Sequence, residues 1–446
     1  MKFPPYSTYR PSGVEWLGDV PEHWQSKRLK GAATYWVSNV DKVAAEDEMS
    51  VRMCNYTDVY YHEHISPSME LMETTATPEE VRRFGLKVDD VVITKDSEEW
   101  SDIAVPSLVV ESAPNLICGY HLAIIRPKKS ELLGRFLLRV FQACAVNQQF
   151  QVAATGVTRY GLPKSSIGEA WLPLPSLPEQ CAIADFLDSE MAKIDTLVTK
   201  KRTLIERLNE KRTALISRTV TRGLPPDVAR AAGFDPHPKL KASGIDWLGD
   251  VPAHWEVMQL KRAVMFQRGH DLPADERENG SVPLVSSSGV SATHSRAVAK
   301  GPGIVTGRYG TIGRFYLVAE DYWPLNTTLY SIDLRGNEHR FLQAVLNHLS
   351  PLFLLNAVKS AVPGVNRNDI HPIAAVVPPV PEQKAIADFL DREMARIDQM
   401  VAMVETAIER LQEYRAALIT AAVTGKIDVR KTTQDDSISG EMGMIV

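Results

Sequence analysis

A short loop punctuated by glycines carries the residues of this sequence best suited to bind a polyanion. Gly307-Arg308-Tyr309-Gly310-Thr311-Ile312-Gly313 joins two apolar runs, 303–306 and 314–318, that are predicted to be strands. A glycine-rich loop can come close to a nucleic-acid backbone, and the planar guanidinium of an arginine can form paired hydrogen bonds with a phosphate or with guanine. An ordinary hairpin turn with an exposed arginine is the alternative interpretation.

A repeated pattern adds weight to the binding interpretation. Gly156-Val157-Thr158-Arg159 and Gly364-Val365-Asn366-Arg367 share the order Gly-Val-x-Arg, and each stands shortly before a long predicted helix. Two widely separated copies are less expected of incidental turns. The repetition therefore favours a binding role for both arginines.

Signatures of catalysis are missing from the sequence. There is no GxxxxGK[ST] loop for ATP, no GxGxxG turn, no HExxH or GxSxG motif, and no carboxylate–lysine set with the spacing of a nuclease. The segment 234–238, FDPHP, only faintly resembles the Asp-Pro-Pro-Tyr motif of base methyltransferases. These observations favour binding over catalysis.

Composition limits the class of protein further. The 446 residues are enough for two or three domains, and a net charge of -5 argues against an indiscriminate polyanion binder, although a balanced total can hide local basic faces. Cys54, Cys118, Cys144 and Cys181 form no CxxC pair, so we expect buried thiols in a reducing compartment rather than disulfides or a zinc site. The N-terminus has no signal-like apolar region, and no run of about 18 apolar residues occurs. We therefore expect a cytoplasmic protein.

A long helix, predicted over 177–224, is the clearest element of the scaffold that must position these residues. Its apolar side chains recur at spacings of three and four and form a narrow stripe, which predicts a second helix packed against it. The second helix is predicted over 380–425, which repeats the first at an offset of 203 and also begins with Pro-Glu-Gln, a favourable helix start. The stripe of the first helix contains Ile183, Phe186, Leu187, Met191, Ile194, Leu197, Val198, Leu204, Ile205, Leu208, Leu215 and Ile216.

The whole chain is a tandem duplication. The head segment 12–24, SGVEWLGDVPEHW, returns at 243–255 as SGIDWLGDVPAHW, at an offset of 231. Each half therefore consists of a head, a body and a long helix, but the two bodies, 30–171 and 261–377, look unrelated. This contrast predicts one platform that presents two different reading surfaces.

The heads contain residues that could be mistaken for a site. Their tryptophans and histidines could suggest base stacking or metal binding, but we expect them to pack the first strand and turn of each half. These residues are Trp16, Trp24, His23, Trp247, Trp255 and His254.

Both bodies are predicted to mix strands with helices. In the first body, 91–94 and 121–126 are predicted strands, and 130–147 is a predicted helix. In the second body, a helix over 338–355 follows the two strands that flank the glycine loop. The proline-rich stretch between the halves suits a linker.

The duplicated segments resemble the specificity subunit of type I restriction-modification systems. The matching motifs are the SG(V/I)(E/D)WLGDVPxHW heads, the PEQxAIADFLDxEMAxID helix starts and the RxALI segments, each present twice and in the same order from about Ser12 to Gly425. Lys95-Asp96-Ser97 and the segment 118–127, CGYHLAIIRP, are also similar to segments common in that family's recognition domains.

The resemblance implies an α/β (α+β) fold with an internal pseudo-twofold duplication. Two target recognition domains with irregular β-cores would be separated by two long antiparallel coiled-coil helices. The expected boundaries are 1–176 and 242–377 for the recognition domains, 177–224 and 378–427 for the long helices, 225–241 for the linker and 428–446 for a disordered tail.

The resemblance also implies a function in DNA recognition. Each recognition domain would read one half of a bipartite double-stranded target. The helices would hold two methyltransferase subunits, and two ATP-dependent restriction and translocase subunits would join them. S-adenosylmethionine and ATP would be bound by those partners, so we expect no cofactor, no metal and no catalytic residue in this chain.

Two groups of site residues follow from these arguments. The candidates for DNA contact are Lys95, Ser97, Tyr120, Arg159 and Tyr160 in the first domain and Arg308, Tyr309, Thr311, Asn366 and Arg367 in the second. The candidates for partner docking, expected on exposed helix faces, are Glu179, Asp185, Asp188, Glu382, Asp388 and Asp391. For these acids, complementarity to the positive end of the helix dipole is an equally good explanation.

Two other functions remain open from the sequence. A self-contained enzyme could both recognise and modify DNA, and it would bind S-adenosylmethionine or cleave DNA by itself. A coiled-coil adaptor could bind proteins only, although divergent bodies on a duplicated frame argue against it.

Overall fold

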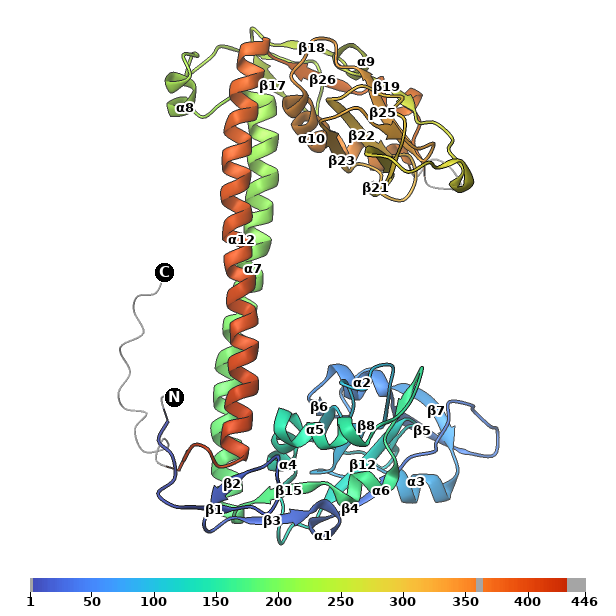
Figure 1. Cartoon of the computed structure of the whole chain (residues 1–446), viewed down its shortest axis with the longest axis vertical. Helices are drawn as coiled ribbons and strands as arrows, with labels where there is room; N and C mark the ends of the chain where they lie inside the picture. The colour runs from blue at the N-terminus through green and yellow to red at the C-terminus, as the bar shows by residue number, and fades with distance from the viewer. Residues whose placement is uncertain (1–2, 358–363, 431–446) are drawn as a thin grey trace. The chain divides into compact units, whose positions relative to one another are not determined.

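The chain divides into two compact units. The computed structural model describes residues 3–357 and 364–430. The first unit comprises 1–200 and 406–446, and the second unit comprises 201–405. Each unit contains one β-rich body and half of each long helix (Figure 1). The predicted mixed α/β fold, with two β-rich bodies and two long packed helices, is confirmed.

The body of the first unit is built on a five-stranded sheet in the order β4-β12-β8-β10-β6, in which only the β10–β6 pair is parallel. The strands are β4 (Ala33–Val37), β12 (Leu122–Pro127), β8 (Val91–Thr94), β10 (Pro106–Val109) and β6 (His64–Ile65). Side chains of β8 alternate between two cores, with Val91 and Ile93 in one and Val92 in the other. The sheet is therefore covered on both faces, as expected when successive side chains of a strand point to opposite sides.

The predicted helix over 130–147 is wrong in its extent. The structure has two helices instead, α4 (Gly134–Gln142) and α5 (Cys144–Ala153), separated by Ala143 in an extended conformation. The bend brings Phe141 and Phe150 into a parallel stack with their ring centroids 5.0 Å apart. Packing of two large rings thus overrides a continuous helical pattern.

The long helices α7 (Leu177–Arg222) and α12 (Val380–Val423) begin and end within two residues of 177–224 and 380–425, the bounds predicted from the helix repeat. In the first unit, the start of α7 packs its Ile183 and Leu187 in one core with Leu418 and Ala422 near the end of α12. In the second unit, the end of α7 shares a core with the start of α12. The two helices are therefore antiparallel.

The body of the second unit is built on a four-stranded antiparallel sheet in the order β19-β25-β22-β23. The strands are β19 (Met265–Arg268), β25 (Thr328–Asp333), β22 (Gly303–Gly307) and β23 (Phe315–Val318). Helix α10 (His339–Ala357) packs against β22 and β23. A second sheet, β21-β20-β24, contains Gly289–His294, Val282–Ser286 and Trp323–Pro324.

The two heads pack as expected. Trp24 and Trp255 are fully buried, and each indole Nε1 donates a hydrogen bond to a glutamate at the start of a long helix, Glu179 (3.1 Å) or Glu382 (3.2 Å). Trp16 packs against the core of the first unit, whereas Trp247 is 45% exposed. In each half, the hydrogen bond from the head tryptophan therefore joins the first strands to the start of a long helix.

Three local features differ, wholly or in part, from expectation. Cys54 and Cys118 are buried thiols, but Cys144 and Cys181 are exposed, so the expectation of four buried thiols is wrong. The stretch predicted as a linker contains a short helix, α8 (Pro226–Ala231). Of the predicted disordered tail, 428–430 is ordered and Val429 is buried, while 431–446 lies outside the described residues.

Candidate nucleic-acid interface

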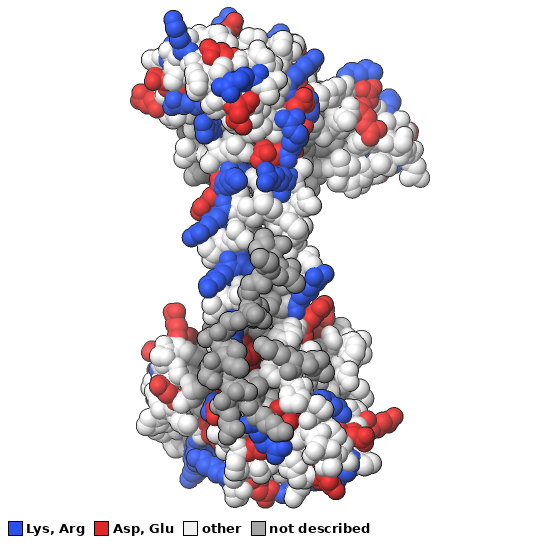
Figure 2. Space-filling model, turned by 90° about the vertical axis from the view of Figure 1, so that its left-hand side faces the viewer, with Lys and Arg blue, Asp and Glu red and all other residues white. Residues whose placement is uncertain are grey.

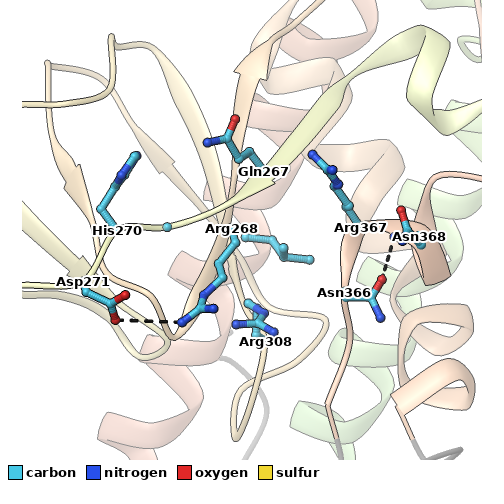
Figure 3. A pocket seen from close by; sticks show the side chains of 10 residues that line it. Gln267, Arg268, His270, Asp271, Arg308, Asn366, Arg367 and Asn368 are labelled. Atoms are coloured by element: carbon cyan, nitrogen blue, oxygen red, sulfur yellow. Dashed lines mark hydrogen bonds and ion pairs between the residues drawn. The ribbon is translucent and has the colours of Figure 1, made fainter.

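An open cavity of about 700 Å³ in the second unit collects polar and basic side chains from three separate segments. One segment spans the end of β19, one follows β22, and the third spans the start of the short helix α11 (Arg367–Ile370). Figure 3 shows Arg268 and Arg308 on one side of the opening and Asn366 and Arg367 on the other. The cavity is lined by Gln267, Arg268, Gly269, His270, Asp271, Arg308, Leu329, Asn366, Arg367 and Asn368.

Arg308 is held in place by its own backbone and by its loop. Its N–H donates to the Thr327 carbonyl (2.8 Å), and its Nη1 donates to the Asn326 carbonyl (3.2 Å). Its guanidinium lies 5.1 Å from the ring centre of Tyr309. The buried Nε has no hydrogen-bond partner among the described residues. The guanidinium is thus fixed at the wall of the cavity, where its accessible edge can meet an external acceptor.

The Gly-Val-x-Arg segment of the second unit lies against this loop. The Val365 N–H donates to the Arg308 carbonyl (3.0 Å), and a side chain at position 364 would collide with the Tyr309 ring, 2.5 Å from the added Cβ. Asn366 caps α11 by accepting from the Asn368 N–H (2.8 Å). Glycine at 364 therefore allows the close approach that places Asn366 and Arg367 at the cavity.

Charge in the cavity is predominantly positive. Three arginines line it against one aspartate, and the Arg268–Asp271 pair is loose at 3.8 Å. Asp271 also accepts a hydrogen bond from the Asn326 amide. Over the face drawn in Figure 2, basic and acidic side chains are interspersed on both bodies, which fits the small net charge of the chain. The cavity is thus a local concentration of cations within a balanced surface.

The structure brings together three of the five residues predicted for the second domain. Arg308, Asn366 and Arg367 line the cavity. Tyr309 does not line it but is 43% exposed beside it, and the hydroxyl of Thr311 is used internally, since it donates to the Ser287 carbonyl. Thr311 therefore has a structural role in closing the loop.

Sequence reasoning missed the contribution of β19. Gln267, Arg268 and His270 all reach the cavity from the end of this strand. The sequence did contain a signal for these residues. The run Gln-Arg-Gly-His-Asp directly follows an apolar stretch and combines long polar side chains with a glycine. Asn368, the residue after Arg367 in α11, was also missed.

The candidates of the first unit gather around a small three-stranded sheet. It consists of β13 (Thr155–Gly156), β14 (Tyr160–Gly161) and β9 (Asp96–Ser97), with Tyr160 paired to Ser97. At Gly156, φ is +147°, and an added Cβ would lie 2.0 Å from the Arg159 carbonyl oxygen. The glycine of the first Gly-Val-x-Arg copy is therefore required by its turn.

Asp96 is the centre of the first-unit site. Lys95 Nζ lies 2.6 Å from one carboxylate oxygen, and the His121 ring contacts the other. Burial alone would raise the pKa of Asp96, but the hydrogen bonds from Lys95 and His121 outweigh it and lower that pKa. Asp96 is thus held ionised, and it partly neutralises Lys95.

The remaining first-unit candidates differ in their exposure. Arg159 is exposed, and Tyr160 and Tyr120 are partly buried. The Tyr120 ring lies 3.9 Å from the His121 ring, between centroids, and Lys42 approaches its face. Ser97 is only 6% exposed. Sequence reasoning missed His121 and Lys42, although the histidine stands directly beside Tyr120.

Two of the acids proposed for partner docking are not on an exposed face. Glu179 and Glu382 are 4% and 7% exposed, because they accept hydrogen bonds from the head tryptophans and contact His23 and His254. Their expected exposure is wrong. A glutamate after proline at a helix start gave no sign that a distant tryptophan would cover it.

The other four acids are exposed or partly exposed but already have basic partners. Arg135 contacts both Asp185 (2.7 Å) and Asp188 (2.5 Å). In the same way, Arg340 contacts both Asp388 (2.9 Å) and Asp391 (2.7 Å). These acids fasten each body to a long helix, whether or not they also meet a partner.

Two kinds of feature are absent from 3–357 and 364–430. No group of three or more His, Cys, Asp or Glu side chains is arranged to hold a metal ion. No helix in these ranges is long and apolar enough to cross a membrane.

Comparison with known proteins gives relatives along the whole chain. A family model described as the type I restriction modification DNA specificity domain matches residues 252–409. A protein assigned as the type I restriction enzyme MjaX specificity subunit of Methanocaldococcus jannaschii is 20% identical over 437 residues, which are 93% of this chain and 96% of that protein. The EcoBI specificity subunit of Escherichia coli is 23% identical over 320 residues, 64% of this chain and 65% of that one.

Two solved structures share the fold. The HsdS subunit from Thermoanaerobacter tengcongensis aligns with a TM-score of 0.52 and 16% identity over 92% of this chain and 98% of its own. A chain from a structure on complex assembly and conformational transition of the type I R-M system aligns with a TM-score of 0.64 and 15% identity, over 92% of this chain and 99% of its own.

Proposed function

We propose, because this chain belongs to the family of type I restriction-modification DNA specificity subunits, that each of its two β-rich bodies reads one half of a bipartite duplex target. The chain is a non-catalytic specificity subunit, and it works within a type I complex that binds DNA. The observation that carries the proposal is the cavity of the second unit, where Arg268, Arg308 and Arg367 meet side-chain amides.

The chemistry of this cavity suits direct reading of base edges. Arginine can donate two hydrogen bonds to guanine O6 and N7, and the amides of Gln267 and Asn366 can pair with adenine N6 and N7. Phosphate contacts by the remaining cations would set the register of the protein on the duplex. Arg308 is the principal candidate for base contact, because it lines the cavity and is held in place by its bond to the Asn326 carbonyl.

The first body would read its half-site with different chemistry. The ionised Asp96 can accept a hydrogen bond from cytosine N4, while Arg159 is free to lie toward a phosphate or a guanine. Tyr120 and Tyr160 offer further hydroxyl contacts. Two bodies with unlike side chains would make the target asymmetric.

The duplicated helices would serve as the scaffold for the catalytic partners. We propose that two methyltransferase subunits dock on the repeated surfaces that include Asp185, Asp188, Asp388 and Asp391, and that two ATP-dependent restriction and translocase subunits join them. S-adenosylmethionine and ATP would belong to these partners. The methyltransferase must extrude an adenine to reach it, and the specificity chain would hold the duplex in place meanwhile.

Methylation mapping tests the proposal. Genomes from cells that express this chain with its cognate methyltransferase are compared with genomes from cells that express the methyltransferase alone. A bipartite motif that is methylated only when the chain is present is the expected result. The same motif in both samples would mean that the chain does not specify the sequence, and the adaptor function would then replace this one.

A further inference from the structure

Four basic side chains form a stripe on the second-unit part of α7. Arg207, Lys211, Arg218 and Arg222 follow one another at spacings of four, seven and four residues, which places them on one face of the helix over roughly 22 Å. All four are exposed, and none forms a salt bridge with another described residue. We call this set the cationic stripe.

The cationic stripe is unfavourable for the helix itself. Arg207 with Lys211 and Arg218 with Arg222 are like-charge pairs four residues apart, and such pairs destabilise a helix. Glu206 directly precedes Arg207 and lies on another face, whereas Glu210 follows Arg207 by three positions and can offset part of its charge. Arg222 complements the helix dipole in the last turn, but Lys211 and Arg218 have no such role within the helix, which suggests an external anion.

The duplicated helix lacks the stripe. At an offset of 203, the corresponding positions in α12 and just beyond its end are Arg410, Tyr414, Ala421 and Gly425. Ala421 is 6% exposed, and a side chain added at position 425 would collide with Pro21 in the first unit, 2.3 Å from the new Cβ. The stripe is thus a property of one half of the duplication.

The end of the stripe faces the body of the second unit. Arg218 and Arg222 line a cavity of about 490 Å³ together with Trp247 of the head and His348 of α10. Burial lowers the pKa of His348, so the positive charge at this cavity comes from the two arginines. The stripe therefore ends beside the head and α10 of the same unit that carries the cavity around Arg308.

We infer that the cationic stripe binds the phosphate backbone of the duplex beside the half-site read by the second body, without regard to sequence. This inference rests on the proposed function, because the anion is the target DNA itself. A row of cations along one helix face over about 22 Å matches the regular charge of a duplex, which presents several phosphates per strand over that length. Reading of bases remains with the cavity around Arg308.

The test compares two charge-matched variants of the full chain, each assembled with its methyltransferase subunits. One variant carries Arg207→Gln, Lys211→Gln, Arg218→Gln and Arg222→Gln. The control carries Arg202→Gln, Arg392→Gln, Arg396→Gln and Arg410→Gln, which removes four exposed cations from other helix faces. Fluorescence anisotropy gives Kd for a target duplex and for a duplex of scrambled sequence at salt concentrations from about 50 to about 200 mM. Circular dichroism confirms the helix content.

The stripe variant should bind both duplexes about 10–100-fold more weakly at about 0.1 M salt. The slope of log Kd against log salt should fall by about 0.9 for each phosphate that the variant no longer neutralises. The ratio of the two Kd values should not change.

Equal slopes in the stripe variant and the control would overturn the inference. Release of the methyltransferase from the stripe variant in native mass spectrometry would also overturn it, since the stripe would then bind protein. Failure of the wild-type complex to prefer its target would instead refute the proposed function.

Discussion

The two candidate reading sites occupy the same place in duplicated halves, yet their chemistry is opposite. In each unit, the site follows a central antiparallel strand, β8 or β22. The residues after that strand bond to the Gly-Val-x-Arg segment in the second unit and to β14, directly after this segment, in the first. A paired carboxylate, Asp96, is central in the first unit, and the partly unpaired guanidinium of Arg308 is central in the second. Under the proposed function, the comparison means that the frame fixes where a base is read, while a few side chains decide which base.

The largest expected difference between the two units is in the stability that the buried glutamate beneath each head contributes. Glu179 is contacted by Tyr6 (2.8 Å), His23, Trp24 and Arg430, whereas Glu382 is contacted by His254 and Trp255. Glu179→Gln should destabilise the first unit by about 1.5–3 kcal/mol, since it removes a charged acceptor from buried donors. Hydrogen exchange of each unit measures the effect.

Glu382→Gln provides the matched comparison for this prediction. It should weaken the second unit by less, because fewer donors are deprived of a charged partner. Equal decreases in protection for the two variants would show that the additional contacts of Glu179 carry no stability.

The specificity of the second site should depend on Arg308. Arg308→Ala should reduce discrimination at one base pair of one half-site by about 1–3 kcal/mol, since it removes the paired hydrogen bonds from arginine to guanine. Binding of the assembled complex to duplexes with single base-pair changes measures this. Arg335→Ala, which removes an exposed cation of the same unit, is the control and should leave every position unchanged. An effect spread evenly over both half-sites would contradict a base-reading role.

The carboxylate of the first site should make that unit acid-sensitive. The pKa of Asp96 is lowered in the folded chain, so its ionised form contributes stability that is complete above the unfolded pKa near 4 and is lost as pH falls through the folded value. Asp96→Asn should cost roughly 1 kcal/mol at neutral pH and should reduce the further loss of stability below about pH 4. Thermal melting between strongly acidic and neutral pH measures both effects. A variant that loses as much stability below about pH 4 as the wild-type chain would contradict them.

The smallest expected difference between the two units is in the stability that the ion pairs between α7 and α12 contribute. Arg212 contacts Asp398 in the second unit, and the repeated pair in the first unit joins Arg415 to Asp195 at 2.5 Å. Both pairs are largely exposed, so Arg212→Ala should cost only about 0.2–1 kcal/mol. Arg415→Ala should cost slightly more because Arg415 also contacts Glu63. Urea unfolding followed by circular dichroism compares the two variants, and a larger effect of Arg212→Ala would contradict this ranking.

The repeats made the scaffold predictable from the sequence. The bounds of α7 and α12 follow from Pro-Glu-Gln starts, apolar spacing and glycines beyond each end, all of which are local signals. The strands next to the sites, such as β8 and β22, were predictable for the same reason, since their apolar runs are short and end in polar residues.

Long-range contacts made the rest unpredictable. The break at Ala143 depends on the stacking of Phe141 with Phe150, and the burial of Glu179 depends on Trp24, a residue 155 positions away. Arg268 reaches the cavity of Arg308 only because β19 and β22 flank the same strand, β25. None of these contacts has a signature within one segment, so local pattern alone could not reveal them.

The central claim is that each body specifies its own half of the target. The most direct measurement exchanges residues 261–377 for the corresponding body of a related specificity chain and maps the methylation motif with the same methyltransferase. The account predicts that one half of the motif changes and the other half stays the same. A motif that stays wholly unchanged, or one in which both halves change, would contradict it.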